Sequence, residues 1–187
     1  MDIRIQTSTS PRTKVAVDQL GFGKVKSDHM FLMEAVDGVW QNPRIIPYGP
    51  LSMDPAAKVL HYGQEIFEGL KAYRSGDGRV LLFRPEDNFR RLAEGAERLS
   101  MPPLPVETGI EALTASLKLD LAWVPEAPAT LYIRHSIVGA EPALGLSASR
   151  KVTLCVNNSH FAPLVGNAFA SFRLLAGSKN ARHVAAV

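Results

Sequence analysis

The sequence predicts an α+β domain, in which two helices pack against an antiparallel sheet that is rich in hairpins. Two turn signals, Asp37-Gly38 and the segment 75–78, each lie between strand-like stretches and are typical of hairpins. Two helical segments then follow one another directly, and grouped helices favour a layered α+β domain over a doubly wound sheet. The length of 187 residues suits one large domain, or a small domain with part of another.

The first part of the chain is expected to consist mainly of strands. Residues 28–36 form a strand-like stretch, and residues 39–46 would return antiparallel to it. Three prolines then carry the chain through an irregular crossing. Asp54-Pro55 has the form of a helix N-cap followed by proline at the first helical position, which predicts a short helical turn within 52–60.

The stretch 61–73, which reads HYGQEIFEGLKAY, is expected to end in a strand that continues through Arg74. Glu68-Gly69 lies at its centre. A glycine inside a strand marks a bend, or a close approach by a ligand or another backbone. Residues 79–83 would pair back against this strand after the second hairpin turn.

The two helices are predicted from the spacing of apolar residues and from the prolines that end them. The first begins near Pro85 and the second covers 107–123. Two further strands are expected at 130–140 and 151–157. No strand or helix rhythm is found in 159–187. The face of the first helix that should meet the sheet carries Phe89, Leu92, Ala93, Ala96 and Leu99.

The composition argues against several classes of protein. The 21 basic and 18 acidic residues are interspersed, so no nucleic-acid-binding surface is indicated. Cys155 is the only cysteine, which excludes a disulfide within the chain and argues against a cysteine-based zinc site. The five histidines show no metal-ligand spacing. No apolar run approaches a membrane span, and no apolar signal opens the chain, so a cytoplasmic protein without membrane contact is expected.

Four stretches follow one another along the chain: FGKVKSDHM at 22–30, HYGQEIFEGLKAY at 61–73, NFRRL at 88–92 and LYIR at 131–134. In this order they resemble the branched-chain aminotransferases, which are fold-type IV pyridoxal-phosphate enzymes. The similarity extends from about Phe22 to about Asn158. It implies the small α+β domain of that fold at 21–158, between a loose N-terminal arm at 1–20 and a divergent tail at 159–187 that begins the linker to a cofactor-binding domain.

Arg91 is the candidate for binding the cofactor. It lies on the first predicted helix, away from the Phe89 and Leu92 face, so its guanidinium can point away from the core. A guanidinium offers a planar fork of donors that matches phosphate oxygens. In the family, the arginine of the Asn-x-x-Arg-Leu pattern contacts the cofactor phosphate, and residues 88–92 match that pattern.

Tyr132 and Arg134 are the candidates for binding the substrate carboxylate. They alternate with Ile133 along one strand, so both should lie on the same face of the sheet. The family uses a Tyr-x-Arg pair at its substrate pocket, and these two residues match it. The resemblance further implies that the rings of Phe22, Tyr62 and Phe67 line the side-chain pocket, where an apolar wall would favour Leu, Ile and Val.

The resemblance also predicts that a catalytic residue is absent. In the family, the Schiff-base lysine stands in a Gly-Thr-Gly-x-x-Lys-x-Gly-Gly-Asn-Tyr run, well after the Tyr-x-Arg strand. Lys179 stands in Gly-Ser-Lys-Asn, and Pro163 occupies the place of the lysine relative to Gly166-Asn167. We therefore expect no catalytic lysine, and we expect this chain to be an inactive, truncated portion of such an enzyme without its C-terminal domain.

The function implied by the resemblance is transamination of Leu, Ile and Val with 2-oxoglutarate, with pyridoxal 5'-phosphate as cofactor and glutamate and 2-oxo acids as further reactants. Glu141-Pro142-x-x-Gly145 resembles the loop through which family members reach a neighbouring subunit's site, which implies a homodimer. One alternative is a D-amino acid transaminase or an aminodeoxychorismate lyase, against which Phe22 and the Tyr-x-Arg motif argue. The other alternative is a domain without catalysis that only binds a partner.

Overall fold

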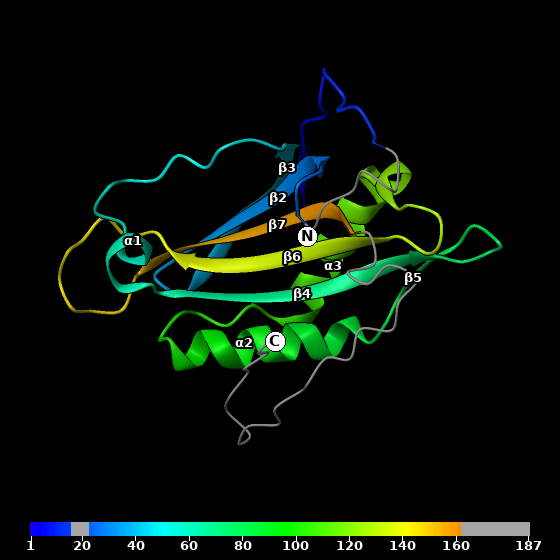
Figure 1. Ribbon diagram of the computed structural model, residues 1–187. Coiled ribbons are helices and arrows are strands. Elements are labelled where there is room, and N and C mark those ends of the chain that lie inside the picture. Colours follow the sequence, from blue (N-terminus) through cyan, green and yellow to red (C-terminus); the bar gives the residue numbers. More distant parts are fainter. Residues whose placement is uncertain (16–22, 162–187) are drawn as a thin grey trace, which may run out of the picture.

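The computed structural model describes residues 1–15 and 23–161. In this part of the chain a single curved sheet is covered by helices on one face (Figure 1), in strand order β1-β3-β2-β7-β6-β4-β5. The strands are β1 (Arg4–Ile5), β2 (Lys26–Val36), β3 (Val39–Pro47), β4 (Glu65–Arg74), β5 (Val80–Leu82), β6 (Thr130–Gly139) and β7 (Lys151–Phe161). The helices are α1 (Lys58–Tyr62), α2 (Pro85–Arg98), α3 (Val106–Leu119) and the short 3-10 helix η2 (Leu121–Trp123). The predicted α+β fold, with a hairpin-rich sheet and two packed helices, is confirmed.

Most of the sheet is antiparallel, as the hairpin signals predicted. Asp37 and Gly38 join β2 to β3 with φ of 48° and 84°, the left-handed pair that a tight hairpin turn requires. β1 pairs with β3 in parallel and is the exception. β7 lies between β2 and β6, and it continues to Phe161, whereas the sequence predicted its end at residue 157. The sheet is therefore centred on β7, which is the last strand along the described chain.

The main hydrophobic core lies between the sheet and the helices α2 and α3. Leu131, Ile133 and Ile137 alternate along β6 and are fully buried, and Phe89 and Leu92 of α2 are no more than 1% exposed. The period of two along the strand and the helical spacing of α2 produce these matching faces. The residues between them on β6, including Tyr132 and Arg134, lie on the opposite, open face of the sheet.

Two helix boundaries differ from the sequence prediction. The expected turn within 52–60 is replaced by α1 at Lys58–Tyr62, because Asp54 closes a local turn instead of starting a helix: its carboxylate accepts the N–H of Ala56 at 2.8 Å. Gly63, at φ 61°, ends α1 in the left-handed conformation that glycine favours. The second main helix stops at Leu119, and the separate turn η2 replaces its predicted last residues.

The described part of the N-terminal arm is attached to the sheet at several points. Arg4–Ile5 pairs with β3, and the N–H of Ser8 donates to Nε2 of His29 at 2.9 Å. The N–H of Arg12 donates to the carboxylate of Asp28 at 2.6 Å. Within residues 1–15 and 23–161, no helix is both long and apolar enough to cross a membrane.

Candidate active site

Tyr132 and Arg134 lie side by side on the open face of the sheet, as the period of two predicted. The Nε–H of Arg134 donates to the phenolic oxygen of Tyr132 at 3.1 Å. Its guanidinium carbon also lies 4.1 Å from the centre of the Phe67 ring, on the neighbouring strand β4. A cation held over an aromatic face in this way keeps a defined orientation. The structure thus brings together three of the predicted substrate residues.

Gly69 makes room for this arrangement. A Cβ atom at this position would lie 2.0 Å from the phenolic oxygen of Tyr132, a distance that no real contact allows. Glycine in the middle of β4 therefore permits the Tyr132 side chain to lie across the strand. The sequence predicted a bend or a close approach here, and the close approach is made by a side chain.

A cleft of about 290 Å³ opens beside this pair, and it is basic. No acidic residue lines the cleft among the described residues. Burial, and next the charge of Arg134, lower the pKa of Lys26 from its ordinary value. Two cations that repel each other in one cleft favour the binding of an anion such as a carboxylate. The cleft is lined by Gly23, Lys26, Tyr132, Arg134, Asn157 and Ser159.

Arg91 is held by a buried carboxylate. Its Nε and Nη2 donate to the two oxygens of Glu68, at 3.1 and 2.9 Å. Glu68 is 5% exposed, whereas the Arg91 side chain is 46% exposed. These hydrogen bonds are the main cause that raises the pKa of Arg91. The bidentate contact fixes the guanidinium plane and leaves Nη1 as the nitrogen that is not bonded to Glu68.

Two further residues lie close to Glu68 among the described residues. The side-chain amide of Asn88 donates to Glu68 at 2.9 Å and to the carbonyl of Gly69 at 3.1 Å, so it joins α2 to β4. His135 stands opposite Glu68 in the β4–β6 register and is fully buried. Burial lowers its pKa to about 4, so the imidazole is neutral near pH 7.

The candidate residues form two groups on opposite faces of β4. Phe67, with Tyr132 and Arg134, lies on the open face, whereas Glu68 and Arg91 lie on the helix side. β5 pairs only with residues 72–74 of β4, so the earlier part of β4 forms the margin of the described sheet. A ligand at this margin could meet both groups.

Of the two other predicted aromatic residues, only Tyr62 is described, and it is not part of these groups. Tyr62 lies at the end of α1, where its hydroxyl donates to the carbonyl of Leu144 and its side chain is about half exposed. Phe22 lies outside the described residues. The assignment of both rings to a side-chain pocket stays a prediction.

The sequence prediction missed five residues of these groups. The sequence analysis assigned no role to Glu68, although a carboxylate in an apolar strand indicates a buried partner. Asn88 precedes Arg91 by three positions, a helical spacing that places both on one side of α2. Lys26 belongs to β2, whereas Asn157 and Ser159 belong to β7. Only the long-range register of these strands brings the three residues together at the cleft.

Several curated proteins are similar in sequence to this chain. Branched-chain-amino-acid transaminase 1 of Bacillus subtilis is 52% identical over 139 residues, which are 73% of this chain and 39% of the relative. Branched-chain-amino-acid aminotransferase 2 of the same species is 49% identical and covers 82% of this chain and 43% of the relative. A Mycolicibacterium smegmatis branched-chain-amino-acid aminotransferase is 44% identical, with 81% and 43% covered. This chain therefore spans about two fifths of the length of these relatives. No family model matches it.

Solved structures show the same fold. A T.th. branched-chain amino acid aminotransferase with pyridoxamine 5'-phosphate aligns with a TM-score of 0.59 at 21% identity, over 77% of this chain and 43% of that one. The enzyme of Thermoproteus uzoniensis with norvaline aligns with a TM-score of 0.55 at 22% identity, over 70% and 40%. The described fold is that of the small domain of a fold-type IV aminotransferase. Over the matched residues, the chain is homologous to the N-terminal part of the branched-chain-amino-acid aminotransferases.

Proposed function

We propose that this chain forms the small-domain side of the active site of a branched-chain-amino-acid transaminase, which exchanges the amino group of Leu, Ile or Val with 2-oxoglutarate. One observation carries the proposal: in a homologue of these enzymes, Arg134 is oriented by Tyr132 and lies over the ring of Phe67 in a basic cleft. A carboxylate bound by Arg134 would bring the rest of an amino acid close to an aromatic surface. This combination suits an amino acid with an apolar side chain.

The residues on the helix side fit the phosphate of pyridoxal 5'-phosphate. Arg91 has one guanidinium edge fixed by Glu68 and is about half exposed, so its remaining N–H groups can donate to a phosphate oxygen. The cofactor, when bound, supplies the electron sink for reactions at the α-carbon of amino acids. Arg91 would hold and orient its phosphate. Related structures were solved with pyridoxamine 5'-phosphate and with N-(5'-phosphopyridoxyl)-L-glutamate.

The residues on the open face would bind and orient the substrate. Arg134 and Lys26 would attract a carboxylate, and the phenol of Tyr132 would add a hydrogen bond. Two cations in one cleft also suit glutamate and 2-oxoglutarate, which carry a second carboxylate. The half-exposed ring of Phe67 would exclude water from the apolar side chain of Leu, Ile or Val.

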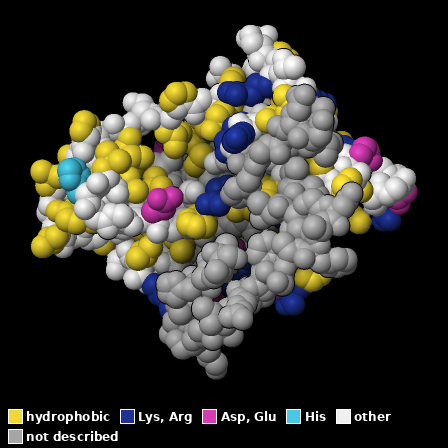
Figure 2. Space-filling view, in the orientation of Figure 1, with side chains coloured by type: hydrophobic (Ala, Val, Ile, Leu, Met, Phe, Trp, Pro, Cys, Tyr) yellow, Lys and Arg dark blue, Asp and Glu magenta, His cyan; other side chains and the backbone are white. Residues whose placement is uncertain are grey.

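The further proposals concern the partners and the cellular location. The loop 141–149 is held by the buried Lys58, whose ammonium donates to the carbonyl of Gly145 at 2.6 Å. Apolar side chains gather at this end of the molecule (Figure 2), where Leu144 is 60% and Leu146 is 92% exposed. Large exposed apolar groups on a fixed loop are typical of an interface. They support a homodimer. We further propose a cytoplasmic location and no nucleic-acid or membrane partner.

The same loop supports a second candidate function, a domain without catalysis that only pairs with a partner. The two proposals differ in whether the site residues matter for amino transfer. The lysine that anchors the cofactor in the family is expected to be absent from this chain, and Lys179 lies outside the described residues.

The test uses a hybrid protein, in which residues 1–161 are joined to the C-terminal part of branched-chain-amino-acid transaminase 1 of Bacillus subtilis. Amino transfer from leucine to 2-oxoglutarate is measured. The hybrid should be active and the 187-residue chain inactive. Arg134→Met should lower kcat/KM about tenfold or more, because a hydrogen bond to a charged group contributes about 1.5–3 kcal/mol. Arg79→Met, at an exposed turn, is the matched control. Turnover by the 187-residue chain, with a specific covalent adduct of the cofactor at Lys179, would contradict the proposal, as would equal loss in both variants.

A further inference from the structure

The strand β2 contains a bulge next to the basic cleft. Lys26 pairs with Ser159 of β7 and Met30 pairs with Asn157, so three residues of β2, 27–29, stand opposite a single residue of β7. A bulge interrupts the ladder of hydrogen bonds between two strands and bends the strand that contains it. Bulges are frequent beside active sites, where they change the direction in which a side chain points.

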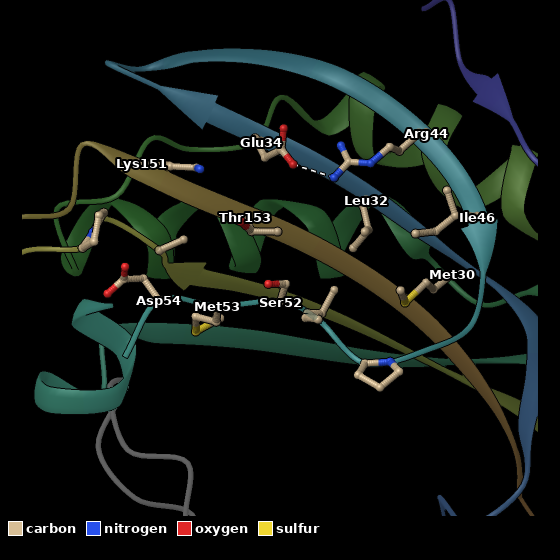
Figure 3. A pocket seen from close by; sticks show the side chains of 14 residues that line it. Met30, Leu32, Glu34, Arg44, Ile46, Ser52, Met53, Asp54, Lys151 and Thr153 are labelled. Atoms are coloured by element: carbon tan, nitrogen blue, oxygen red, sulfur yellow. Dashed lines mark hydrogen bonds and ion pairs between the residues drawn. The ribbon is translucent and has the colours of Figure 1, made fainter. Parts of the chain in front are cut away.

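Beyond the bulge, β2 is regular against β7. From Met30 to Glu34 the two strands advance residue for residue, and both side chains line a cavity of about 510 Å³ on the open face of the sheet (Figure 3). If this spacing continued toward the N-terminus, Asp28 would be the next residue on the open face, opposite Ser159. The bulge places Lys26 there instead. It therefore exchanges an acidic side chain for a basic one where Ser159 lines the cleft.

A regular strand without the bulge is the competing arrangement. It differs from the observed one by a shift of two residues at the start of β2. Side chains of a strand alternate between the two faces of the sheet, so a shift of two residues leaves each of them on its own face. The hydrophobic pattern of β2 therefore does not select between the two arrangements. Specific contacts must hold the bulge in place.

Asp28 binds three other parts of the fold from within the bulge. Its carboxylate accepts the N–H of Arg12 at 2.6 Å and the indole N–H of Trp123 at 2.8 Å. Its carbonyl accepts the N–H of Tyr48, the residue after β3, at 2.8 Å. In a regular strand this carboxylate would face the cleft. The indole N–H of Trp123, which is 2% exposed, would then lose its acceptor, and an unsatisfied buried donor is costly.

His29 provides a second anchor in the same bulge. Its Nδ1 lies 2.6 Å from Oδ1 of Asp120, and its backbone N–H donates to Oδ2 at 3.3 Å. Its Nε2 accepts the N–H of Ser8 at 2.9 Å, so Nδ1 carries the proton and donates to Asp120. His29 and Asp120 are both buried. The contacts of Asp28 and His29 together tie the bulge to the N-terminal arm and to the end of α3.

We propose that Asp28 is a positioning residue of the cleft: its carboxylate locks the bulge of β2 and so directs Lys26, and not an acidic side chain, toward a bound carboxylate. Asp28 acts through Lys26 and does not itself contact the ligand. Because Arg12 is one of its partners, the N-terminal arm takes part in this positioning. The inference rests on the proposed function in one respect, that the cleft binds a carboxylate.

The test uses a substitution for which charge and positioning predict opposite results. Asp28→Asn keeps the size of the side chain, but the amide cannot accept both N–H groups. It also removes a negative charge near a basic cleft, which by charge alone would strengthen the binding of an anion. The ¹⁵N-labelled 187-residue chain is titrated with 4-methyl-2-oxopentanoate, and the side-chain amide of Asn157 reports binding in the cleft. Asp28→Asn should weaken binding about fivefold or more, and Lys26→Met about tenfold.

Two comparisons show whether the effect passes through Lys26. In the Lys26→Met background, Asp28→Asn should change the affinity by less than about twofold, because the side chain that it positions is absent. Asp37→Asn is the matched control. It removes the same charge at an exposed hairpin turn, where asparagine tolerates the φ of 48°, and it should leave the affinity unchanged.

The register of β2 is measured in the same samples. A nuclear Overhauser effect between backbone protons of Lys26 and Ser159 is expected in the unmodified chain. In Asp28→Asn it should be replaced by one between residue 28 and Ser159. Melting curves check that each variant is folded. If Asp28→Asn unfolds, Trp123→Phe takes its place, because it removes only the indole donor to Asp28.

Unchanged or tighter binding in folded Asp28→Asn would overturn the proposal. So would an equal loss in the Lys26→Met background, or a contact between Lys26 and Ser159 that Asp28→Asn leaves intact. The absence of a saturable shift in the unmodified chain would instead contradict the carboxylate site of the proposed function. The contact between Lys26 and Ser159 would then still decide whether Asp28 locks the bulge.

Discussion

Replacing Arg91 by methionine should destabilise the domain more than replacing its neighbour Arg90. Methionine keeps much of the aliphatic volume but removes both donors to Glu68, whose carboxylate is 5% exposed. The carboxylate would stay buried with fewer hydrogen bonds. Arg90 instead pairs with Asp87 at 2.5 Å, with side chains that are 60% and 27% exposed.

The expected loss in the free energy of unfolding depends on how deeply each ion pair is buried. Breaking a fully buried ion pair costs about 3–5 kcal/mol, and breaking an exposed pair costs about 0.2–1 kcal/mol. The Arg91 side chain is 46% exposed, so solvent screens part of the interaction. We therefore expect Arg91→Met to lower the free energy of unfolding by about 1.5–3 kcal/mol, which is the range for hydrogen bonds to charged groups. Arg90→Met should cost less than about 1 kcal/mol.

Urea unfolding, followed by the fluorescence of the buried Trp123, measures both free energies. A double-mutant cycle with Glu68→Gln isolates the pair, and its coupling energy should exceed about 1 kcal/mol. A coupling energy near zero, or equal losses for Arg91→Met and Arg90→Met, would refute the view that Glu68 fixes Arg91.

Two other predictions concern the strands around this pair. Burial lowers the pKa of His135 from 6.5 to about 4, so the unfolded chain takes up a proton below pH 6.5 that the folded chain excludes down to about pH 4. The free energy of unfolding should therefore fall by about 3 kcal/mol as the pH decreases through this window, and His135→Leu should remove that part of the pH dependence in urea titrations. Gly69→Ala should cost about 1–3 kcal/mol in thermal melts, because its Cβ would meet Tyr132, whereas Gly49→Ala meets nothing within 4 Å and should be neutral.

The predictions from sequence succeeded where local signals decide the structure. The Asp37-Gly38 turn and Pro85 at the start of α2 act within a few residues, and both elements were found as expected. The predicted position of α1 was wrong because the Asp54 carboxylate accepts a nearby N–H instead of starting a helix. The end of the helix is set by Gly63. β7 extends to Phe161 because its last residues pair with β6. The residues 157–160 are polar, so the sequence pattern did not indicate that the strand continues.

The candidate site shows the same difference between local signals, which the sequence reveals, and long-range contacts, which it does not. The period of two along β6 was sufficient to place Tyr132 and Arg134 on one face. The Glu68–Arg91 contact joins residues 23 positions apart, and its geometry depends on how α2 packs on β4. Lys26 reaches the cleft through the pairing of β2 with β7, where it stands opposite Ser159. Such long-range register cannot be read from local patterns.

The affinity of the hybrid protein for pyridoxal 5'-phosphate tests the central claim, that this chain holds the cofactor phosphate through Arg91. In absorbance titrations, Arg91→Ala should weaken binding about tenfold or more, because it removes a charge-assisted contact of about 1.5–3 kcal/mol. Arg91→Lys should recover only part of the loss, because lysine restores the charge without the planar fork. Arg90→Ala should have little effect, and melting curves confirm that each variant is folded. Equal affinities for Arg91→Ala and the unmodified hybrid, or a larger loss for Arg90→Ala, would contradict the account.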